Sequence, residues 1–254
     1  MVLLIDAGNT RIKWAIVDSA VKSSLGHWLR EGSMLHAELS EERAPWNGQK
    51  IQRVLMSNVA GEAVQERLLR TLQLHSVTVE RVISKASLAN IKNHYQQPDQ
   101  LGSDRFAAAI GAHALFPNQD LLIATCGTAT TIDAVSAQGD FIGGMIAPGL
   151  LLMADSLAKN TGQLPHVQNM AHGKKASFAV ETTSAILSGC LAAQAGAIEF
   201  AVKQFSETTQ VNLTKGQPLC ILSGGAAPYI QSSLRVSHRL IENLVLIGLQ
   251  VISQ

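Results

Sequence analysis

The stretch that decides the fold is V-L-L-I-D-A-G-N-T-R-I-K-W-A-I-V, at residues 2–17. An apolar run leads into a turn of small and polar residues, and alternating apolar residues follow. The same rhythm returns in L-L-I-A-T-C-G-T-A-T-T-I-D-A-V, at residues 121–135, where Gly127 takes the place of Gly8. Each copy predicts two strands joined by a tight turn. Two copies predict two similar halves, and such turns offer backbone N–H groups to phosphate.

Length and composition allow this two-part architecture. A chain of 254 residues holds one large domain or two of about 120 residues each. The repeat favours two, at residues 1–117 and 118–254. A hydrophobic fraction of 46% and a charged fraction of 15% are typical of a protein with a large core. The net charge of +1 gives no reason to expect nucleic acid or anionic lipid as a partner.

The sequence predicts a cytoplasmic protein. No apolar run reaches the roughly 18 residues of a membrane span, so no membrane partner is expected. The chain opens on a strand-like segment without a basic leader. Its three cysteines are odd in number and lack C-x-x-C spacing, as expected of reduced thiols.

Strand and helix signals alternate along the rest of the chain, which predicts an α/β fold. Strands are expected at residues 52–58, 77–83 and 219–222, and helices at 61–74, from 102 onward, and at 182–205. Residues 92–101 are polar, contain Pro98 and predict a loop. The segment F-I-G-G-M-I-A-P-G-L predicts a strand interrupted by glycines, with Pro148 at the start of a helix.

The first candidate site is D-A-G-N-T at residues 6–10, followed by Lys13. A carboxylate that ends a buried strand can hold Mg²⁺, which takes few protein ligands. Gly8, Asn9 and Thr10 can donate to phosphate oxygens, and Lys13 can neutralise charge. An ordinary β-turn explains the Gly-Asn pair equally well. The second copy, C-G-T-A-T-T at residues 126–131, favours phosphate binding.

A third motif, G-S-D-R at residues 102–105, opens a predicted helix. From spacing alone, Ser103 or Asp104 is best explained as a helix N-cap. The alternative pairs Asp104 as a general base with Arg105, whose planar fork binds a carboxylate through two hydrogen bonds.

Two glycine-rich motifs follow strands, G-G-M-I-A-P-G at 143–149 and S-G-G-A at 223–226. Each indicates either a plain turn or a close approach by backbone or nucleotide. The chain has no G-x-x-x-x-G-K-[ST] phosphate loop, and no His and carboxylate spacing indicates a metal site made by protein ligands alone.

Taken in order, D-A-G-N-T-R-I-K, G-S-D-R, G-T-A-T-T-I-D, G-G-M-I-A-P-G-L and E-N-L-V-L-I-G-L resemble the motifs of type III pantothenate kinases. The resemblance spans nearly the whole chain. It implies two ribonuclease-H-like halves of the acetate and sugar kinase, heat-shock chaperone and actin superfamily, with mixed sheets flanked by helices. It also implies a homodimer that phosphorylates the 4′-hydroxyl of pantothenate with ATP, the first committed step of coenzyme A synthesis.

Carried over position by position, the resemblance implies that ATP is held between the two halves. It also implies that Asp104 is the general base and that Arg105 binds the pantothenate carboxylate. Asp6 would bind Mg²⁺, and Thr128 would serve a second phosphate loop. The remaining ATP contacts implied are Ala7, Gly8, Asn9, Thr10, Arg11, Ile12 and Lys13, and the remaining pantothenate contacts are Tyr95, Gly102, Ser103 and Thr182. Because Thr183 is adjacent to Thr182, the sequence does not decide which of the two threonines contacts pantothenate. Each of the contacts from Tyr95 and Thr182 has a structural alternative: Tyr95 could be an ordinary surface aromatic, and Thr182 could be a helix N-cap.

The chain departs from the family at Thr125, where many members carry an Asp that helps to bind K⁺ or NH₄⁺. A threonine supplies no counter-charge, so a monovalent cation is not expected to be required here. Sugar kinases, acetate kinases and exopolyphosphatases share the phosphate loops but not G-S-D-R with its helix. The alternative outside the enzymes is an accessory protein that binds a partner, is regulated by nucleotide and performs little catalysis.

Overall fold

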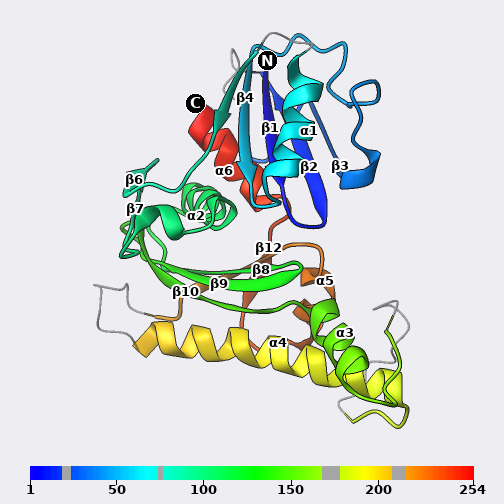
Figure 1. Cartoon of the computed structure of the whole chain (residues 1–254). Coiled ribbons are helices and arrows are strands. Elements are labelled where there is room, and N and C mark those ends of the chain that lie inside the picture. The colour runs from blue at the N-terminus through cyan, green and yellow to red at the C-terminus, as the bar shows by residue number, and fades with distance from the viewer. Residues whose placement is uncertain (19–23, 74–76, 168–177, 208–215) are drawn as a thin grey trace. The chain divides into compact units, whose positions relative to one another are not determined.

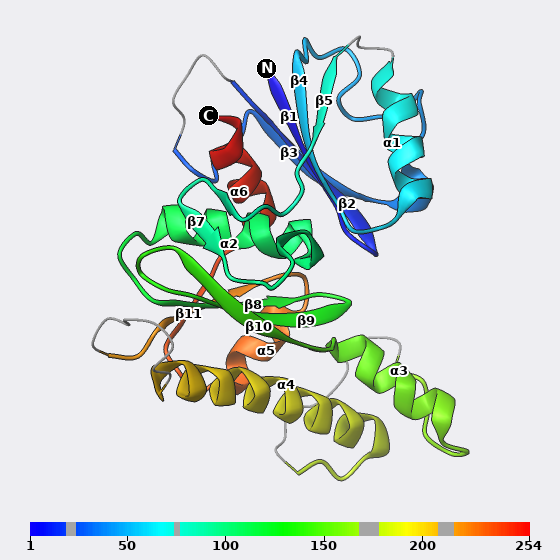
Figure 2. The same cartoon turned by 60° about the vertical axis from the view of Figure 1, so that its left-hand side comes forward.

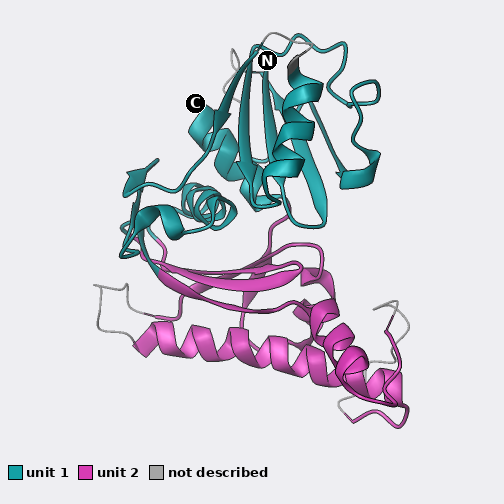
Figure 3. Ribbon diagram, viewed as in Figure 1, with its two compact units in different colours: residues 1–118, 138–142, 243–254 teal, residues 119–137, 143–242 magenta. Residues whose placement is uncertain are grey.

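A computed structural model of the protein describes residues 1–18, 24–73, 77–167, 178–207 and 216–254. They form two compact units (Figure 3). Unit 1 contains Met1–Asn118, Gln138–Ile142 and Asn243–Gln254, and unit 2 contains Gln119–Ala137 and Gly143–Glu242. The units therefore do not follow the consecutive halves 1–117 and 118–254, and that division stays a prediction about the two repeats.

The central sheet of unit 1 has the strand order β3-β2-β1-β4-β5. β1 pairs antiparallel with β2, and β2 antiparallel with β3, whereas β4 and β5 continue the sheet in parallel. The predicted first hairpin is thus confirmed, with Asp6 opposite Lys13. The strands are β1 Val2–Ala7, β2 Arg11–Val17, β3 Arg30–Leu35, β4 Arg53–Asn58 and β5 Thr78–Arg81.

Unit 2 repeats this sheet in the order β10-β9-β8-β11-β12. β8 pairs antiparallel with β9 and parallel with β11, and β11 is parallel to β12. The β8–β9 hairpin therefore occupies the place of β1–β2, which confirms the predicted α/β fold with two similar parts. The strands are β8 Leu121–Cys126, β9 Ala129–Val135, β10 Asp140–Pro148, β11 Leu219–Ser223 and β12 His238–Leu240.

Helices pack beside both sheets (Figures 1 and 2). Unit 1 has α1 Glu62–Gln73, α2 Ser103–Leu115, α6 Leu244–Ser253 and the short 3₁₀ turns η1 His36–Glu38 and η2 Pro98–Gln100. Unit 2 has α3 Leu150–Asn160, α4 Thr182–Glu207, α5 Ala227–Ile230 and η4 Gln231–Ser233. Pro148 closes β10 instead of starting a helix, because Gly149 takes the N-cap position of α3.

The segment predicted as a loop before α2 is more ordered than its polar composition indicates. β6 Ser87–Leu88 and β7 Ile91–Asn93 form a short ladder, and the first residues of β10 pair with β7. Asn93 is buried, and its side-chain amide donates to the carbonyl of Pro98 at 2.9 Å. Strand pairing and this hydrogen bond thus give the polar segment a defined backbone conformation.

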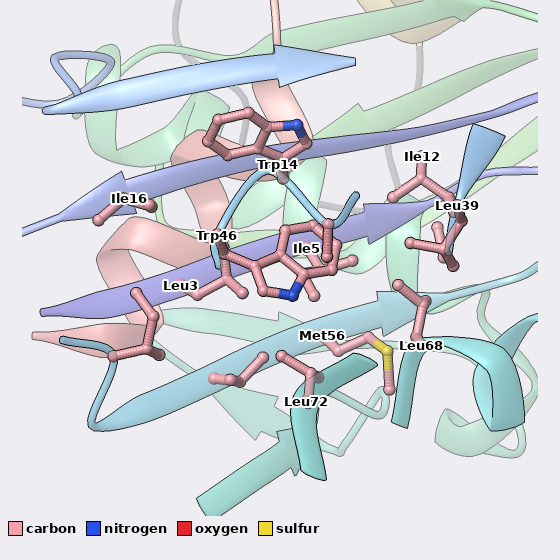
Figure 4. Packing of buried hydrophobic residues seen from close by; sticks show 14 of the residues in the cluster. Leu3, Ile5, Ile12, Trp14, Ile16, Leu39, Trp46, Met56, Leu68 and Leu72 are labelled. Atoms are coloured by element: carbon pink, nitrogen blue, oxygen red, sulfur yellow. The ribbon is translucent and has the colours of Figure 1, made fainter. Parts of the chain in front are cut away.

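A cluster of buried side chains fills one face of the unit 1 sheet beneath α1 (Figure 4). Leu68 and Leu72 of α1 pack on alternate residues of the strands, as expected for a period of two along each strand. The rings of Trp14 and Trp46 meet edge to face, with centroids 6.3 Å apart. Burial of so many apolar groups is the main source of stability of this unit.

The helices α2 and α6 cross with their backbones in close approach. A Cβ on Gly111 would lie 2.7 Å from the carbonyl oxygen of Leu244, and one on Gly248 would collide with the backbone of Ala107. The C-terminal helix therefore belongs to unit 1 because two glycines let it dock against the helix that opens at Ser103.

The length and composition of α4 bear on the expectation of no membrane span. Among the residues that the structure describes, α4 is the one helix long and apolar enough to cross a membrane by length and composition. No membrane span was expected, because no apolar run in the sequence reaches the roughly 18 residues of a span. The core helix of a globular protein passes the same test, so this finding is weak evidence for a span.

Candidate active site

Asp6 is the first of two acidic side chains in the candidate site. It lies near the end of β1, opposite Lys13 of β2 and level with Ser57 of the parallel strand β4. Although its side chain keeps some exposure, desolvation raises the pKa of the Asp6 carboxyl from 3.8 to about 7. The charge of Asp104 also raises it, whereas Lys13 lowers it. Asp6 thus lies beside a second carboxylate, an arrangement that a divalent cation would stabilise.

The turn after Asp6 is held by its own backbone. The Gly8 N–H donates to the carbonyl of Arg11 at 3.1 Å, so this N–H is not free for phosphate as the turn alone suggests. A ring nitrogen of His36 lies 2.9 Å from the Gly8 carbonyl oxygen. The side chains of Ala7 and Ile12 are fully buried, so any ligand contact from these two residues is through the backbone. The exposed residues of the turn are Asn9, Thr10 and Arg11.

The start of α2 brings a second acid into unit 1. Gly102 is the N-cap residue, so the interpretation of Ser103 or Asp104 as the N-cap is wrong. The Asp104 carboxylate accepts a hydrogen bond from the backbone N–H of Arg105 at 2.8 Å. Burial raises the pKa of Asp104, while Arg105 lowers it by hydrogen bonding and by charge. A Cβ on Gly102 would lie 2.7 Å from Asp104 Oδ1, so glycine leaves room for the carboxylate.

A serine pair fixes the first turn of α2 beside the strand next to Asp6. Ser103 Oγ lies 2.9 Å from Ser57 Oγ, and Ser57 is fully buried. Since Ser57 shares its register with Asp6, this hydrogen bond helps to set Asp104 near Asp6. Sequence reasoning missed Ser57. Its position at the end of a buried apolar strand was the available signal.

The structure brings together Arg105 and Tyr95, the two residues that the resemblance implies as pantothenate contacts. Arg105 is buried and donates from Nη1 to the Tyr95 hydroxyl at 2.8 Å. Tyr95 is half-buried, so its interpretation as a surface aromatic is wrong. Phe141, which sequence reasoning also missed, lies against both residues.

In unit 2, the β8–β9 turn is braced by two glycine motifs. The Gly127 N–H donates to the Ala129 carbonyl at 3.0 Å, and the Gly149 N–H donates to the carbonyl of Thr128 at 2.9 Å. A Cβ on Gly149 would collide with the backbone of this turn, and one on Gly224 would collide with that of Cys126. Of the two alternatives left open for these motifs, a plain turn or a close approach, the structure shows a close approach, made by backbone.

Thr182 lies at the first residue of α4 and is exposed. The carboxylate of Glu181 accepts from the backbone N–H groups of Thr183 and Ser184, both at 2.8 Å. These two hydrogen bonds lower the pKa of Glu181 to about 2. Glu181 thus caps the helix, and the interpretation of Thr182 as the N-cap is wrong.

The donor set suits a divalent metal held mostly by water and phosphate. Among the described residues, no group of three or more His, Cys, Asp or Glu side chains gathers as a metal site. The pair Asp6 and Asp104 remains, and carboxylate oxygens are the ligands that Mg²⁺ prefers in small number.

Comparison with known proteins identifies the family. The family model described as type III pantothenate kinase matches residues 2–204. The type III pantothenate kinase of Janthinobacterium sp. (strain Marseille) is 52% identical over 259 residues, covering 100% of this chain and 97% of the relative. This chain belongs to the type III pantothenate kinase family. The kinase of Herminiimonas arsenicoxydans is 51% identical, with the same coverage of both chains.

Solved structures agree with the fold of this kinase. A Baf family transcriptional activator from Campylobacter jejuni superposes with a TM-score of 0.61 at 19% identity, covering 98% of this chain and 96% of the other. A 2-dehydro-3-deoxygalactonokinase from Sinorhizobium meliloti gives 0.58 at 14% identity, covering 100% and 98%. At such identities the likeness shows the fold alone, that of the sugar kinases and actin-like ATPases. Membership of a kinase family implies ATP and a divalent metal.

Proposed function

We propose that this kinase transfers the terminal phosphoryl group of ATP to the 4′-hydroxyl of pantothenate, the first step of coenzyme A synthesis. Two findings support the proposal. The chain matches its pantothenate kinase relatives from end to end. Unit 1 also gathers two acids of raised pKa, Asp6 and Asp104, next to Arg105. That gathering is the single observation that carries the mechanism.

Asp104 acts as the general base. Its pKa is raised by burial, which makes the carboxylate a better proton acceptor than an exposed aspartate. Arg105 binds the carboxylate of pantothenate and so fixes which end of the substrate faces the acid. Asp104 takes the proton of the reacting hydroxyl as the oxygen–phosphorus bond forms and the bond to the leaving ADP oxygen breaks. Positioning and charge neutralisation supply most of the acceleration in such transfers.

Asp6 holds Mg²⁺, and the residues that follow it contact the phosphates of ATP. When bound, the metal neutralises charge on the phosphate oxygens. Asn9, Thr10 and Arg11 are exposed and contact these oxygens, and Ala7 and Ile12 contribute backbone. Gly8, which has no side chain, lets the phosphates approach the turn closely. Lys13 adds positive charge near Asp6. In unit 2, Thr128 on the braced turn binds phosphate in the same manner.

The remaining substrate contacts follow the resemblance. Tyr95 shares a hydrogen bond with Arg105, and Gly102 and Ser103 border Asp104 in the first turn of α2. Thr182 contacts pantothenate from the exposed first turn of α4. Thr183 is half-buried and donates its N–H to Glu181, which favours Thr182 for this role.

The kinase works as a homodimer in the cytoplasm, without nucleic acid or membrane. Unit 2 exposes large apolar side chains on the end of β10 and on α3, which suit a surface covered by a second copy. These side chains are Met145, Ile146, Leu151, Leu152 and Leu157. The cysteines Cys126, Cys190 and Cys220 are free and buried, as in a reducing compartment. Activity needs no K⁺ or NH₄⁺, because Thr125 offers no counter-charge.

One assay tests the proposal. Purified protein with Mg²⁺ and ATP is given pantothenate, a hexose or acetate, and the release of ADP is measured. Release with pantothenate alone is expected. Release with the hexose or acetate would move the assignment to another kinase of the superfamily. Nucleotide binding without ADP release on any acceptor would support the accessory-protein alternative and contradict the proposal.

A further inference from the structure

Arg105 carries a positive charge into a nearly dry part of unit 1. Its side chain is only 7% exposed, and a charge so buried needs compensating partners. Besides the hydrogen bond to Tyr95, its guanidinium carbon lies 5.7 Å from the centre of the Tyr95 ring and 5.8 Å from that of Phe141. Both distances are within the range of a cation–π interaction. Two ring faces therefore stabilise the same guanidinium.

The two rings form one rigid corner. Tyr95 and Phe141 meet edge to face, with centroids 5.9 Å apart and planes at 65°. We call this pair the aromatic corner. Phe141 is fully buried, whereas Tyr95 is half-buried, so the corner has a core side and an outer side. A guanidinium held against both rings cannot turn without losing one of them.

The β7–β10 ladder explains why the corner is fixed. Phe141 pairs with Asn93, and its carbonyl accepts from the His94 N–H at 3.1 Å. The Asn93 side chain accepts from the Tyr95 N–H at 3.0 Å, which ties the second ring to the same ladder. A ring nitrogen of His94 lies 2.9 Å from Asp140 Oδ1, so the residues next to the two rings are also joined. Arg105 enters from α2 and meets rings already placed by strand pairing.

We propose that Phe141 is a positioning residue that, with Tyr95, orients Arg105 and thereby sets the preference of the enzyme for a substrate bearing a carboxylate. This inference rests on the proposed function. The planar fork of arginine binds a carboxylate through two parallel hydrogen bonds only when its plane is correctly set. Loss of the Phe141 ring leaves the charge in place but frees its orientation, so binding of the carboxylate should suffer more than catalysis.

The test is a specificity measurement on Phe141→Leu, which keeps an apolar side chain but removes the ring. Kinetic constants are measured with pantothenate and with its neutral primary amide, which retains the reacting hydroxyl. The KM for pantothenate should rise about tenfold, with kcat and the KM for ATP within about threefold of wild type. The preference for pantothenate over the amide should fall by a similar factor.

Two further variants separate orientation from general damage to the fold. Leu72→Ala removes buried volume under α1 and should leave the preference at its wild-type value. Phe141→Met is a milder change of volume that still lacks a ring, so it should lower the preference even if Phe141→Leu does not fold.

The outcomes are distinct. Absence of turnover of pantothenate by the wild-type enzyme contradicts the proposed function itself. If wild type turns over pantothenate but the ringless variants keep its preference, or lose activity equally on both substrates, the role of Phe141 is wrong.

Discussion

The hairpins β1–β2 and β8–β9 occupy the same place in two sheets of the same strand order, yet they carry different chemistry. In the first, Asp6 pairs across the strands with Lys13. In the second, the corresponding pair is Thr125 and Thr131, and the Thr131 hydroxyl is buried without a hydrogen-bond partner among the described residues. The two hairpins thus share the same strand pairing, while the charged pair Asp6 and Lys13 has the neutral counterpart Thr125 and Thr131.

The turns of the two hairpins differ as well. Four residues separate the paired positions Ala7 and Ile12, whereas three separate Cys126 and Thr130. The first turn is contacted by the side chain of His36, at the Gly8 carbonyl oxygen. The second is contacted by backbone, through the hydrogen bond from the Gly149 N–H to the Thr128 carbonyl. We interpret unit 1 as the source of acid, base and charge, and the turn of unit 2 as a preformed backbone cradle.

The largest effect is expected at the base, which lies in unit 1. Asp104→Asn should lower kcat by roughly 10²–10⁴ while the protein stays folded, since an amide cannot accept the proton. Initial rates at saturating substrate, together with a thermal unfolding curve, measure this effect. Near-normal turnover in a folded variant would show that another group is the base.

A smaller effect is expected on stability, and it should depend on pH. Because the pKa of Asp6 is raised to about 7, the folded chain binds a proton that the unfolded chain releases above about pH 4. This stabilisation is therefore complete below pH 4 and is lost as the pH rises through 7. Without metal, wild type should lose roughly 2–4 kcal/mol of unfolding free energy, relative to Asp6→Asn, between pH 4 and pH 8.

Denaturant unfolding of both proteins at several pH values tests this. Adding Mg²⁺ at pH 8 should restore stability to wild type but not to Asp6→Asn, because the cation replaces the proton on the acid. Parallel pH curves for the two proteins would rule out a buried, proton-binding Asp6.

In unit 2, the expected effect is steric. Gly149→Ala places a Cβ against the backbone of the Gly127–Thr128 turn and should destabilise the protein by about 1–3 kcal/mol. The φ of Gly149 is −69°, a value that any residue adopts, so backbone strain adds nothing. Gly189→Ala, in α4 with open space around it, is the matched control and should be neutral or stabilising by up to about 1 kcal/mol. Equal melting temperatures for the two variants would contradict the prediction that Gly149 must lack a side chain to pack against this turn.

The smallest effect concerns monovalent cations. In sodium, potassium and ammonium chloride at matched ionic strength, the initial rates of wild type should differ by less than about twofold, as screening alone predicts. Thr125→Asp restores a counter-charge and should introduce a dependence on K⁺. A large, saturable rise with K⁺ or NH₄⁺ in the wild-type enzyme would show that Thr125 does not prevent cation binding.

Much of the fold could be predicted from periodicity. The two hairpins, α1, α2 and α4 follow local patterns of apolar residues, and the structure confirms each of them. Other elements depend on distant partners. β3 is polar along most of its length and becomes a strand by pairing with β2. The docking of α6 in unit 1 depends on the fit of Gly248 to Ala107, which spacing along the sequence cannot indicate.

The site was predicted less completely than the fold. The family resemblance of the motifs identified Asp6, Asp104 and Arg105, whereas spacing alone favoured an ordinary turn or a helix N-cap at these positions equally or more. Ser57 and Phe141 went unnoticed, since a serine after a strand and a phenylalanine in one are common. Their roles depend on contacts with Ser103 and Arg105, which only the folded chain brings about.

The central claim is that the first hairpin carries the metal and charge chemistry and the second serves as backbone. Asp6→Asn and Thr125→Val change one polar side chain at matched positions of the two hairpins, each with little change of shape. The deciding measurement is the initial rate of ADP release with Mg²⁺, ATP and pantothenate for wild type and both variants. Asp6→Asn should lose at least about 100-fold, and Thr125→Val less than about threefold. Equal losses in two folded variants, or the greater loss in Thr125→Val, would contradict this account.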